Sequence, residues 1–209
     1  MIKYALTELF GMTPHFLILA AGQSQRFLNS AGHIKALHQV HGRPWLAVLL
    51  TELLKQEAKI TCVLGFHKEK ILNALSDFSD QVEFVFNPRP ANGAFASLQA
   101  GLKQIKHGQP LFIQPVDCPF LNQADYQYML KQLGMRQVLK PTFQGKSGHP
   151  VLVSPRFQRE LSVAPTELRL DFIIKNLAEH EKASVELNNP HILLNLNELN
   201  DFTEYRPGV

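Results

Sequence analysis

The residues most suited to chemistry form a small-residue loop with two cations close to it. Residues 19–27, LAAGQSQRF, follow the apolar run HFLI, and the small side chains of residues 20–22 leave the backbone N–H groups open to a ligand. Ser24 adds a hydroxyl, Arg26 a planar cation suited to phosphate oxygens, and Lys35 a second, point-like charge. The loop lacks the three glycines of a dinucleotide-binding fingerprint and the GKS or GKT of a P-loop. We therefore interpret it as an anion-binding loop of another kind, with an ordinary strand–helix turn as the alternative.

A second candidate lies in the sequence PVDCPF, residues 115–120, where Asp117 directly follows an apolar run. A carboxylate at the carboxyl end of a strand is a natural ligand for Mg²⁺, which takes only one or two protein carboxylates besides substrate phosphates. The alternative is that Asp117 is a turn residue or caps the helix expected after it. Cys118 has no paired His and Asn arrangement and is interpreted as a small buried residue.

Two further segments carry polar residues beside expected strands. In NPRPANGAFAS, residues 87–97, we expect Asn87, Gly93 and Ser97 near the amino end of a helix, and helix N-termini favour anions. The alternative is a crossover loop that is shaped by its prolines and its glycine. In KSGHPVLVS, His149 stands between a glycine and a proline, which suggests a fixed turn. The nine histidines show no HExxH or similar spacing, which argues against zinc catalysis.

The apolar runs predict the elements that must position these residues. Short apolar, β-branched or aromatic runs predict strands at residues 15–20, 59–65, 81–86, 109–115, 136–140, 149–154, 183–187 and 191–196. Apolar residues at i, i+3 and i+4 predict helices at residues 44–56, 68–78 and 95–106. This alternation predicts an α/β fold, with a three-layer αβα Rossmann-like sheet that is mostly parallel and has an antiparallel element. Ligands of such sheets bind beyond the carboxyl ends of the strands, where the strand order reverses.

Composition limits the classes of function. The chain has 209 residues, of which 45% are hydrophobic and 19% charged, so it can bury a full core as a soluble globular protein. A net charge of +3 without runs of like charge gives little support for nucleic-acid or membrane-surface binding, and no apolar segment reaches the ~20 residues of a membrane span. We expect no signal peptide, and two distant cysteines predict a reducing, cytoplasmic compartment. We predict one domain at residues 14–209 and an N-terminal extension at residues 1–13.

Taken together, these segments resemble a known enzyme family. The order LAAGQSQRF, GHIKAL, HGRPWL, NGAFASLQAGL, VDCPFL, GKSGHPVLV and LLNLNELNDF is similar to that of MobA-like nucleotidyltransferases. It is most similar to the molybdenum cofactor cytidylyltransferase branch, because GHPVLV favours that branch over the isoprenoid and sugar branches. The resemblance covers residues 14–204 and implies a fold of the nucleotide-diphospho-sugar transferase type.

The resemblance also implies a reaction and a site. An NTP, with CTP expected, and a phosphate-bearing acceptor such as molybdopterin would give a nucleotidylated product and pyrophosphate, with Mg²⁺ as cofactor. The implied catalytic residues are Arg26, Lys35 and Asp117, and Mg²⁺ would be held by Asp117 and by Asn197 of the last loop. Nucleotide contacts are expected from Leu19, Ala20, Ala21, Gly22, Ser24, Asn87, Gly93 and Ser97, and acceptor contacts from His149 and Arg169. A molybdoenzyme accessory protein is a further partner that this resemblance suggests.

Two alternatives remain open. The Asn197 pattern also suits a sugar-phosphate or other small-phosphate nucleotidylyltransferase. Because Asn195 and Asn197 stand where the family has acids, a degenerate module that binds nucleotide without transferring it is the second alternative. A phosphate-binding oxidoreductase domain is disfavoured by the missing glycine fingerprint.

Overall fold

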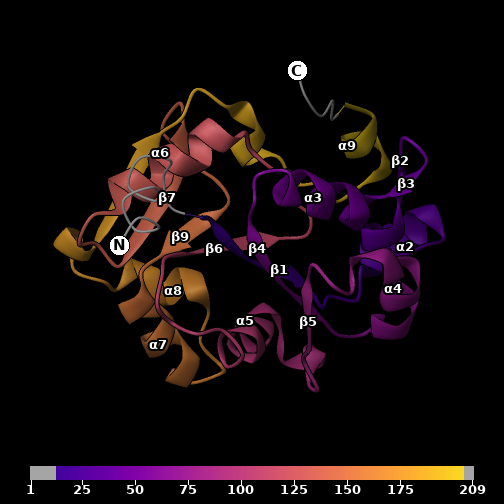
Figure 1. Cartoon of the computed structure of the whole chain (residues 1–209), viewed down its shortest axis with the longest axis horizontal. Coiled ribbons are helices and arrows are strands. Elements are labelled where there is room, and N and C mark those ends of the chain that lie inside the picture. The colour runs from indigo at the N-terminus through magenta and orange to yellow at the C-terminus, as the bar shows by residue number, and fades with distance from the viewer. Residues whose placement is uncertain (1–12, 205–209) are drawn as a thin grey trace.

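A mixed, mostly parallel sheet forms the centre of the protein (Figure 1). The computed structural model describes residues 13–204, and the strands of this sheet are β1 (His15–Ala20), β4 (Lys59–Leu64), β5 (Glu83–Phe86), β6 (Leu111–Pro115), β7 (Val138–Phe143), β8 (Lys146–Ser147), β9 (Val151–Val153) and β10 (Lys182–Glu186). Their order is β10-β7-β9-β6-β1-β4-β5, with β8 paired to β7. β8 and β9 run antiparallel to their neighbours, and the other pairings are parallel. A separate ribbon pairs β2 (Gln39–Val40) with β3 (Arg43–Pro44).

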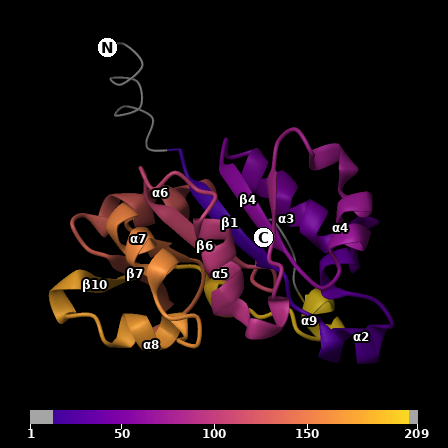
Figure 2. The same cartoon turned by 90° about the horizontal axis from the view of Figure 1, so that it is seen from below.

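Helices cover both faces of the sheet, which gives three layers and confirms the expected α/β fold (Figure 1). α3 (Trp45–Leu54) and α6 (Gln123–Leu133) lie on one face, and α5 (Ala94–Leu102), α7 (Pro155–Val163) and α8 (Leu170–Lys175) on the other. α2 (Gln25–Ala31) and α9 (Leu199–Glu204) lie side by side near the end of β1 (Figure 2), and α4 (Lys68–Ala74) follows β4. Short 3-10 helices are η1 (Lys35–Leu37), η2 (Ser76–Phe78), η3 (Pro90–Asn92), η4 (Glu179–Glu181) and η5 (Pro190–Leu193).

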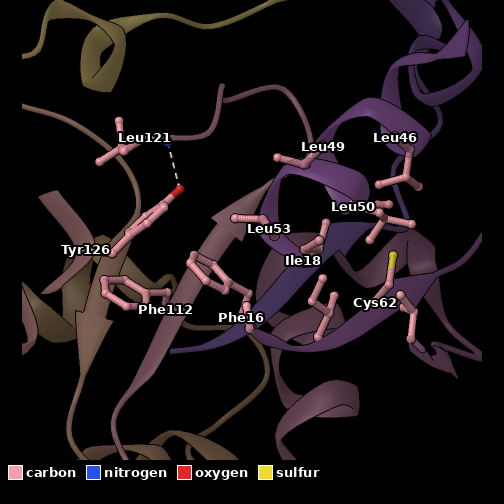
Figure 3. Close-up of a cluster of buried hydrophobic side chains, with 14 of the residues drawn as sticks. Phe16, Ile18, Leu46, Leu49, Leu50, Leu53, Cys62, Phe112, Leu121 and Tyr126 are labelled. Carbon is pink, nitrogen blue, oxygen red and sulfur yellow. Dashed lines mark hydrogen bonds between the residues drawn. The ribbon is translucent and has the colours of Figure 1, made fainter. Parts of the chain in front are cut away.

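The core between the sheet and helices α3 and α6 is built on aromatic side chains (Figure 3). The rings of Phe16 on β1 and Phe112 on β6 stack with centroids 4.9 Å apart, and Tyr126 of α6 packs edge-on against Phe16 at 4.8 Å. The buried Tyr126 hydroxyl accepts a hydrogen bond of 2.8 Å from the backbone N–H of Leu121. This bond fixes the loop between β6 and α6 to the core.

The strand order reverses at β1. The chain passes from β1 to β4 and β5 on one side, and β6 later pairs with β1 on the other side. Leu19 near the end of β1 is in register with Val63 of β4 and with Pro115 of β6. The loops that follow β1 and β6 therefore diverge at one edge of the sheet, which is the position where α/β proteins bind ligands.

The strand predicted at residues 191–196 is wrong. The segment begins instead with η5 (Pro190–Leu193), whose first turn is capped by the side chain of Asn189, which accepts a hydrogen bond of 3.0 Å from a backbone N–H. Ile192 and Leu196 are buried, whereas the leucines between them are partly exposed. Burial at i and i+4 together with the cap outweighs the apolar composition that suggested a strand.

Two further expectations concern the N-terminal extension and membrane-spanning segments. All but the last residue of the predicted extension at residues 1–13 lies outside the described residues. No helix within the described part of the chain is long and apolar enough to cross a membrane.

Candidate active site

A cavity of about 570 Å³ opens where the loops after β1 and β6 diverge. Residues 19–24 of the opening loop form one wall, together with Gly93 and Ser97 at the amino end of α5. Lys35 and Asp117 also line the cavity. Most of the residues expected to contact the nucleotide therefore share one cavity.

The ammonium of Lys35 joins two oxygen atoms from distant parts of the chain. Lys35 Nζ donates a hydrogen bond of 2.7 Å to Asn197 Oδ1 and one of 3.3 Å to Asp117 Oδ2. The Lys35 side chain is 10% exposed and that of Asp117 is 28% exposed, so the pair is partly shielded from water. The structure thus brings together the three residues that the sequence suggested for phosphate and metal binding.

The loop that carries Asp117 is held from several sides. The indole Nε1 of Trp45 donates a hydrogen bond of 2.6 Å to the carbonyl of Val116, and the buried side chain of Gln114 donates one of 2.8 Å to the carbonyl of Cys118. The backbone N–H of Leu196 donates a bond of 2.7 Å to the carbonyl of Asp117 itself. These bonds fix the backbone on both sides of the carboxylate, which therefore keeps its orientation toward the cavity.

Asp117 is not a helix cap. The N-cap of α6 is Asn122, whose side chain accepts a hydrogen bond of 2.9 Å from the backbone N–H of Asp125. The carboxylate of Asp117 faces the ammonium of Lys35 instead. The helix-cap interpretation of Asp117 is therefore wrong. Asn122, which is closer to the helix, accepts the hydrogen bond of a first-turn backbone N–H that has no partner within the helix.

Asn197 is held by the first turn of α9. The Asp201 carboxylate accepts hydrogen bonds of 2.7 Å from the backbone N–H groups of both Asn197 and Glu198. The loop consequently curls around Asp201, and the Asn197 amide oxygen reaches the ammonium of Lys35. Asp201 therefore has a structural role in this loop, while the side-chain amide of Asn197 faces the site.

A small aromatic cluster supports the segment that carries Lys35. It consists of Phe27, Val40, Trp45, Leu196 and Phe202. His33 and His38, on either side of Lys35 in the sequence, stack beside it with centroids 5.2 Å apart and a contact of 2.9 Å between His33 Nε2 and His38 Nδ1. Both rings pack edge-on against Phe27 of this cluster. Burial, followed by the neighbouring His33, lowers the pKa of His38, so this ring stays neutral near pH 7.

One expected catalytic residue, Arg26, and one expected nucleotide contact, Asn87, do not line the first cavity. Arg26 is exposed on the first turn of α2 and does not line the cavity, because the next residue, Phe27, anchors that turn in the aromatic cluster. Asn87 is buried behind the wall, where its Nδ2 donates a hydrogen bond of 2.9 Å to Ser97 Oγ. Ser97 does line the cavity, so Asn87 orients a lining residue and does not form the lining itself.

A second cavity, of about 620 Å³, adjoins the first. Leu19, Gly93 and Pro115 line both cavities, and the second also contains His149 and Arg169. The expected acceptor contacts therefore share one cavity next to the nucleotide contacts.

The two expected acceptor contacts differ in their surroundings. The Arg169 guanidinium is engaged by Asp171 through Nε–Oδ1 and Nη2–Oδ2 distances of 3.0 and 3.1 Å. The Nδ1 atom of His149 is buried and has no hydrogen-bond partner among the described residues. Burial is the main cause that lowers the pKa of His149, so the ring is neutral near pH 7. The His149 ring is therefore neutral with an unpaired but buried nitrogen, whereas the Arg169 charge is already balanced.

Cys118 lies beside Asp117 but lacks the properties of a nucleophile. Burial and the nearby carboxylate of Asp117 raise the pKa of the Cys118 thiol, which stays protonated. Its Sγ lies 3.8 Å from Asp117 Oδ1 and 3.9 Å from Asn195 Oδ1. The interpretation of Cys118 as a small buried residue agrees with this setting.

The donor set at Lys35 fits a hard divalent cation. The carboxylate of Asp117 and the amide oxygen of Asn197 converge on one positive charge, and oxygen donors of this kind suit Mg²⁺ or Mn²⁺. Among residues 13–204 no group of three or more His, Cys, Asp or Glu side chains could hold a metal ion. Water and the phosphate oxygens of a substrate are further ligands that such a cation accepts.

Sequence reasoning missed several residues of the site. The side chains of Trp45 and Asp201 form hydrogen bonds to backbone groups of other residues. Such bonds cannot be recognised from a pattern of residue types in the sequence. Lys140 lines the second cavity, and its signal is a lone charge within the otherwise uncharged strand segment VLKPTF. That signal could have been recognised, since a charge at an inward position of a strand needs an explanation.

Most of the sequence matches a known protein family. Residues 16–183 match the family described as MobA-like NTP transferase domain. No curated protein matches the chain.

Solved structures share the fold at low sequence identity. A nucleotidyl transferase from Methanothermobacter thermautotroptrophicus has a TM-score of 0.74 and 19% identity, covering 92% of this chain and 95% of that chain. A complex of Rv0371c from Mycobacterium tuberculosis with manganese has a TM-score of 0.73 and 16% identity over 95% and 100%. The 4-diphosphocytidyl-2C-methyl-D-erythritol synthase of Anaerococcus prevotii has a TM-score of 0.63 and 13% identity over 91% and 93%. These similarities confirm the nucleotide-diphospho-sugar transferase type of fold.

Proposed function

We propose a specific reaction for this chain, which belongs to the MobA-like NTP transferase family and is a nucleotidyltransferase. In this proposal the NMP of an NTP, with CTP as donor, is joined to the phosphate of a pterin-type acceptor such as molybdopterin. The observation that carries it is the Lys35 ammonium held between Asp117 and Asn197 in the nucleotide-sized cavity. A second cavity that shares a wall with the first gives the acceptor a place beside the donor.

The reaction requires that the two substrates are aligned and that the negative charge of their phosphates is balanced. An acceptor phosphate oxygen attacks the α-phosphorus, the bond from that phosphorus to the bridging oxygen of the β-phosphate breaks, and pyrophosphate leaves with the electron pair. The acceptor phosphate is already mostly ionised at neutral pH, since its second pKa is about 6, so no general base is needed. Alignment of two anions and stabilisation of the charge on the leaving group supply the catalysis.

The residues of the first cavity suit these tasks. The open backbone of residues 20–22 and the amino end of α5 at Gly93 would bind phosphate oxygens through N–H groups. Lys35 would exchange its bonds to Asp117 and Asn197 for bonds to the triphosphate. Arg26 would reach the triphosphate only through a rearrangement of α2.

Mg²⁺ is the cofactor in this proposal. Asp117 and Asn197 would hold it, and the manganese complex of Rv0371c supports a divalent ion in this fold. When bound, the ion would neutralise phosphate charge and polarise the α-phosphate. The role of the protein residues is to offer two oxygens at the edge of the triphosphate site.

We place the acceptor in the second cavity and the reaction in the cytoplasm. His149 would contact the acceptor from the wall of this cavity, and Arg169 would contact it from the rim. Two free cysteines agree with a reducing compartment, and the product would pass to a molybdoenzyme accessory partner. We assign this activity to one domain of residues 14–209, for which the family match over residues 16–183 is the support.

A second candidate is a sugar-phosphate or other small-phosphate nucleotidylyltransferase. The amide of Asn197, in place of a second acid, favours it, and the structural similarity to 4-diphosphocytidyl-2C-methyl-D-erythritol synthase is consistent with it. Both candidates use the same first cavity and release pyrophosphate. They differ in the acceptor that the second cavity selects.

A panel of pyrophosphate-release assays tests the proposal. Each of the four common NTPs is combined with MgCl₂ and with molybdopterin, a sugar 1-phosphate or no acceptor. We expect pyrophosphate with CTP and molybdopterin, together with a cytidylylated product in mass spectrometry. Release with the sugar phosphate alone would establish the second candidate. NTP binding that is insensitive to Mg²⁺, with no pyrophosphate for any acceptor, would identify a binding module without transferase activity.

A further inference from the structure

We propose that Lys140 makes the second cavity selective for acceptors that carry a second anionic group in addition to the phosphate that reacts. This inference rests on the proposed function, because it assigns the second cavity to the acceptor. The observation that carries it is a cationic side chain of the cavity, Lys140, that forms no ion pair with a described residue. The same cavity contains His149, whose buried Nδ1 has no hydrogen-bond partner among the described residues.

The position of Lys140 follows from the sheet. Lys140 lies on β7 two residues after Val138, so both side chains are on the same face of the sheet. Val138 belongs to the core beneath α5, α7 and α8, together with Val151 and Ile174. Val151 and Ile174 also line the second cavity. Lys140 is therefore the point where this apolar core surface opens into the cavity, and its side chain is half-buried there.

Four charged residues line the cavity, and among the described residues Lys140 and Glu167 form no ion pair. Arg169 is neutralised by the two contacts to Asp171, and both side chains are largely exposed at the rim. No hydrogen bond or ion pair joins the ammonium of Lys140 to any residue between 13 and 204. Lys140, a partly buried residue, therefore has no partner for its charge among the described residues. An anionic group of a ligand would supply that partner.

His149 defines the other polar point of the cavity. Its ring is neutral because burial, opposed by the charge of Asp117 and assisted by that of Lys140, lowers its pKa. The ring is therefore close enough to Asp117, which lines the first cavity, and to Lys140, which lines the second, for both charges to affect it. An acceptor whose phosphate lies near Asp117 and Lys35 would extend past the shared wall of the two cavities toward Lys140. The second anionic group would therefore lie on the side of the acceptor remote from the transferred NMP.

Binding of two simple probes tests this selectivity. The probes are 3-phosphoglycerate and glycerol 3-phosphate, which share a phosphomonoester and differ in a carboxylate. Calorimetric titrations use the full chain with MgCl₂ and a CTP analogue whose α,β-bridging oxygen is replaced by methylene. We expect wild type to prefer 3-phosphoglycerate roughly fivefold or more, as for one additional ion pair, and the preference to shrink at high NaCl.

Two matched variants identify the residue responsible. Lys140→Met should bind both probes equally, whereas Lys131→Met, which removes an exposed lysine of α6 that lines neither cavity, should keep the wild-type preference. Thermal unfolding of each variant checks that it is folded. Equal affinity of wild type for both probes, survival of the preference in Lys140→Met, or its loss in Lys131→Met would overturn the proposal. Because binding is measured without transfer, the outcome is separable from the proposed function. A preference without pyrophosphate release contradicts only the reaction, and release without a preference contradicts only the role of Lys140.

Discussion

In the proposed reaction, the ammonium of Lys35 lies where a divalent metal ion and a triphosphate would meet. It contacts Asp117 Oδ2 and Asn197 Oδ1, the same oxygen atoms that would serve as metal ligands. A lysine in this place keeps two oxygen donors together and balances the carboxylate charge. Entry of a nucleotide with its metal ion would release the lysine toward phosphate.

Replacement of this lysine separates its two effects. In Lys35→Met the positive charge is lost while the length of the side chain is kept, so Asp117 and Asn197 are free for a metal ion. We expect Mn²⁺ to bind in the absence of nucleotide about tenfold more tightly than in wild type, because a nearby like charge is removed. Transferase activity should fall on the order of 10²-fold, because a cation on the triphosphate is lost.

Calorimetry with MnCl₂ and a pyrophosphate-release assay measure these two quantities. Lys68→Met, which removes a lysine at the surface of α4, is the control and should change neither. Weaker Mn²⁺ binding in Lys35→Met would contradict the competition between lysine and metal.

Residue types revealed only part of this site in advance. Lys35, Asp117 and Asn197 could be proposed as a group because each follows a recognisable motif, and the structure brings them into contact. The surroundings of Arg26 and Arg169 could not be predicted. The first depends on which side of α2 is anchored by Phe27, and the second on an ion pair with Asp171.

At the scale of elements, the turn after β4 packs closely against the opening loop, residues 19–24, and holds it in place. A Cβ added to Gly65 would lie 2.5 Å from the Ala21 carbonyl oxygen and 2.8 Å from Pro90 Cβ. Phe66, the next residue, donates its backbone N–H to the same Ala21 carbonyl at 3.4 Å. The absence of a side chain at Gly65 therefore sets the position of the wall of the first cavity.

Substitution of this glycine should disturb nucleotide binding. In Gly65→Ala the new methyl group displaces the backbone at Ala21, so we expect the KM for the NTP to rise several-fold and the free energy of unfolding to fall by about 1–3 kcal/mol. Steady-state kinetics and urea unfolding measure the two effects. Gly108→Ala, where an added Cβ meets nothing within 4 Å, is the control. An unchanged KM in Gly65→Ala would show that the loop does not depend on this contact.

The elements themselves were predictable where apolar runs are long. The strands β1, β4 and β6 lie where the sequence placed them, within about two residues at each end, because buried parallel strands read as continuous apolar runs. The segment 191–196 has a similar composition and forms no strand. Its conformation is decided by the cap at Asn189 and by packing against distant elements, and composition does not report either.

At the scale of the whole molecule, the two ends of β1 lie in different surroundings. Its carboxyl end leads into the first cavity, whereas His15 at its amino end contacts Thr61 Oγ1 at 3.2 Å. Burial, followed by the charge of Lys59, lowers the pKa of His15 from 6.5 to about 4. The unfolded chain therefore binds a proton at this histidine at a pH where the folded protein does not.

This difference predicts a loss of stability in acid. Stability falls as the pH drops below 6.5, because protonation favours the unfolded state, and the loss is complete below the folded pKa of about 4. After allowance for solvent screening at this partly exposed site, we expect about 1 kcal/mol of the loss between pH 7 and pH 5 to come from His15. Urea unfolding of wild type and His15→Gln at both pH values measures it. An equal loss in the two proteins would contradict this assignment.

The topology explains why the site could be located from the sequence but not fully described. The reversal of strand order at β1 brings the ends of β1 and β6 together, and this follows from the α/β pattern. The position of α9 beside α2, which brings Asn197 to Lys35, depends on aromatic packing between segments far apart in the chain. Sequence periodicity does not encode such contacts.

The most direct test of the central claim is pyrophosphate release by Asp117→Asn. This change keeps the size of the side chain and removes the charge that faces Lys35. With CTP, MgCl₂ and molybdopterin, we predict a fall in kcat/KM on the order of 10²-fold or more, while Asp80→Asn, an exposed acid remote from the cavity, keeps wild-type activity. Turnover of Asp117→Asn at the wild-type rate would contradict the assignment of this cavity as the transferase site.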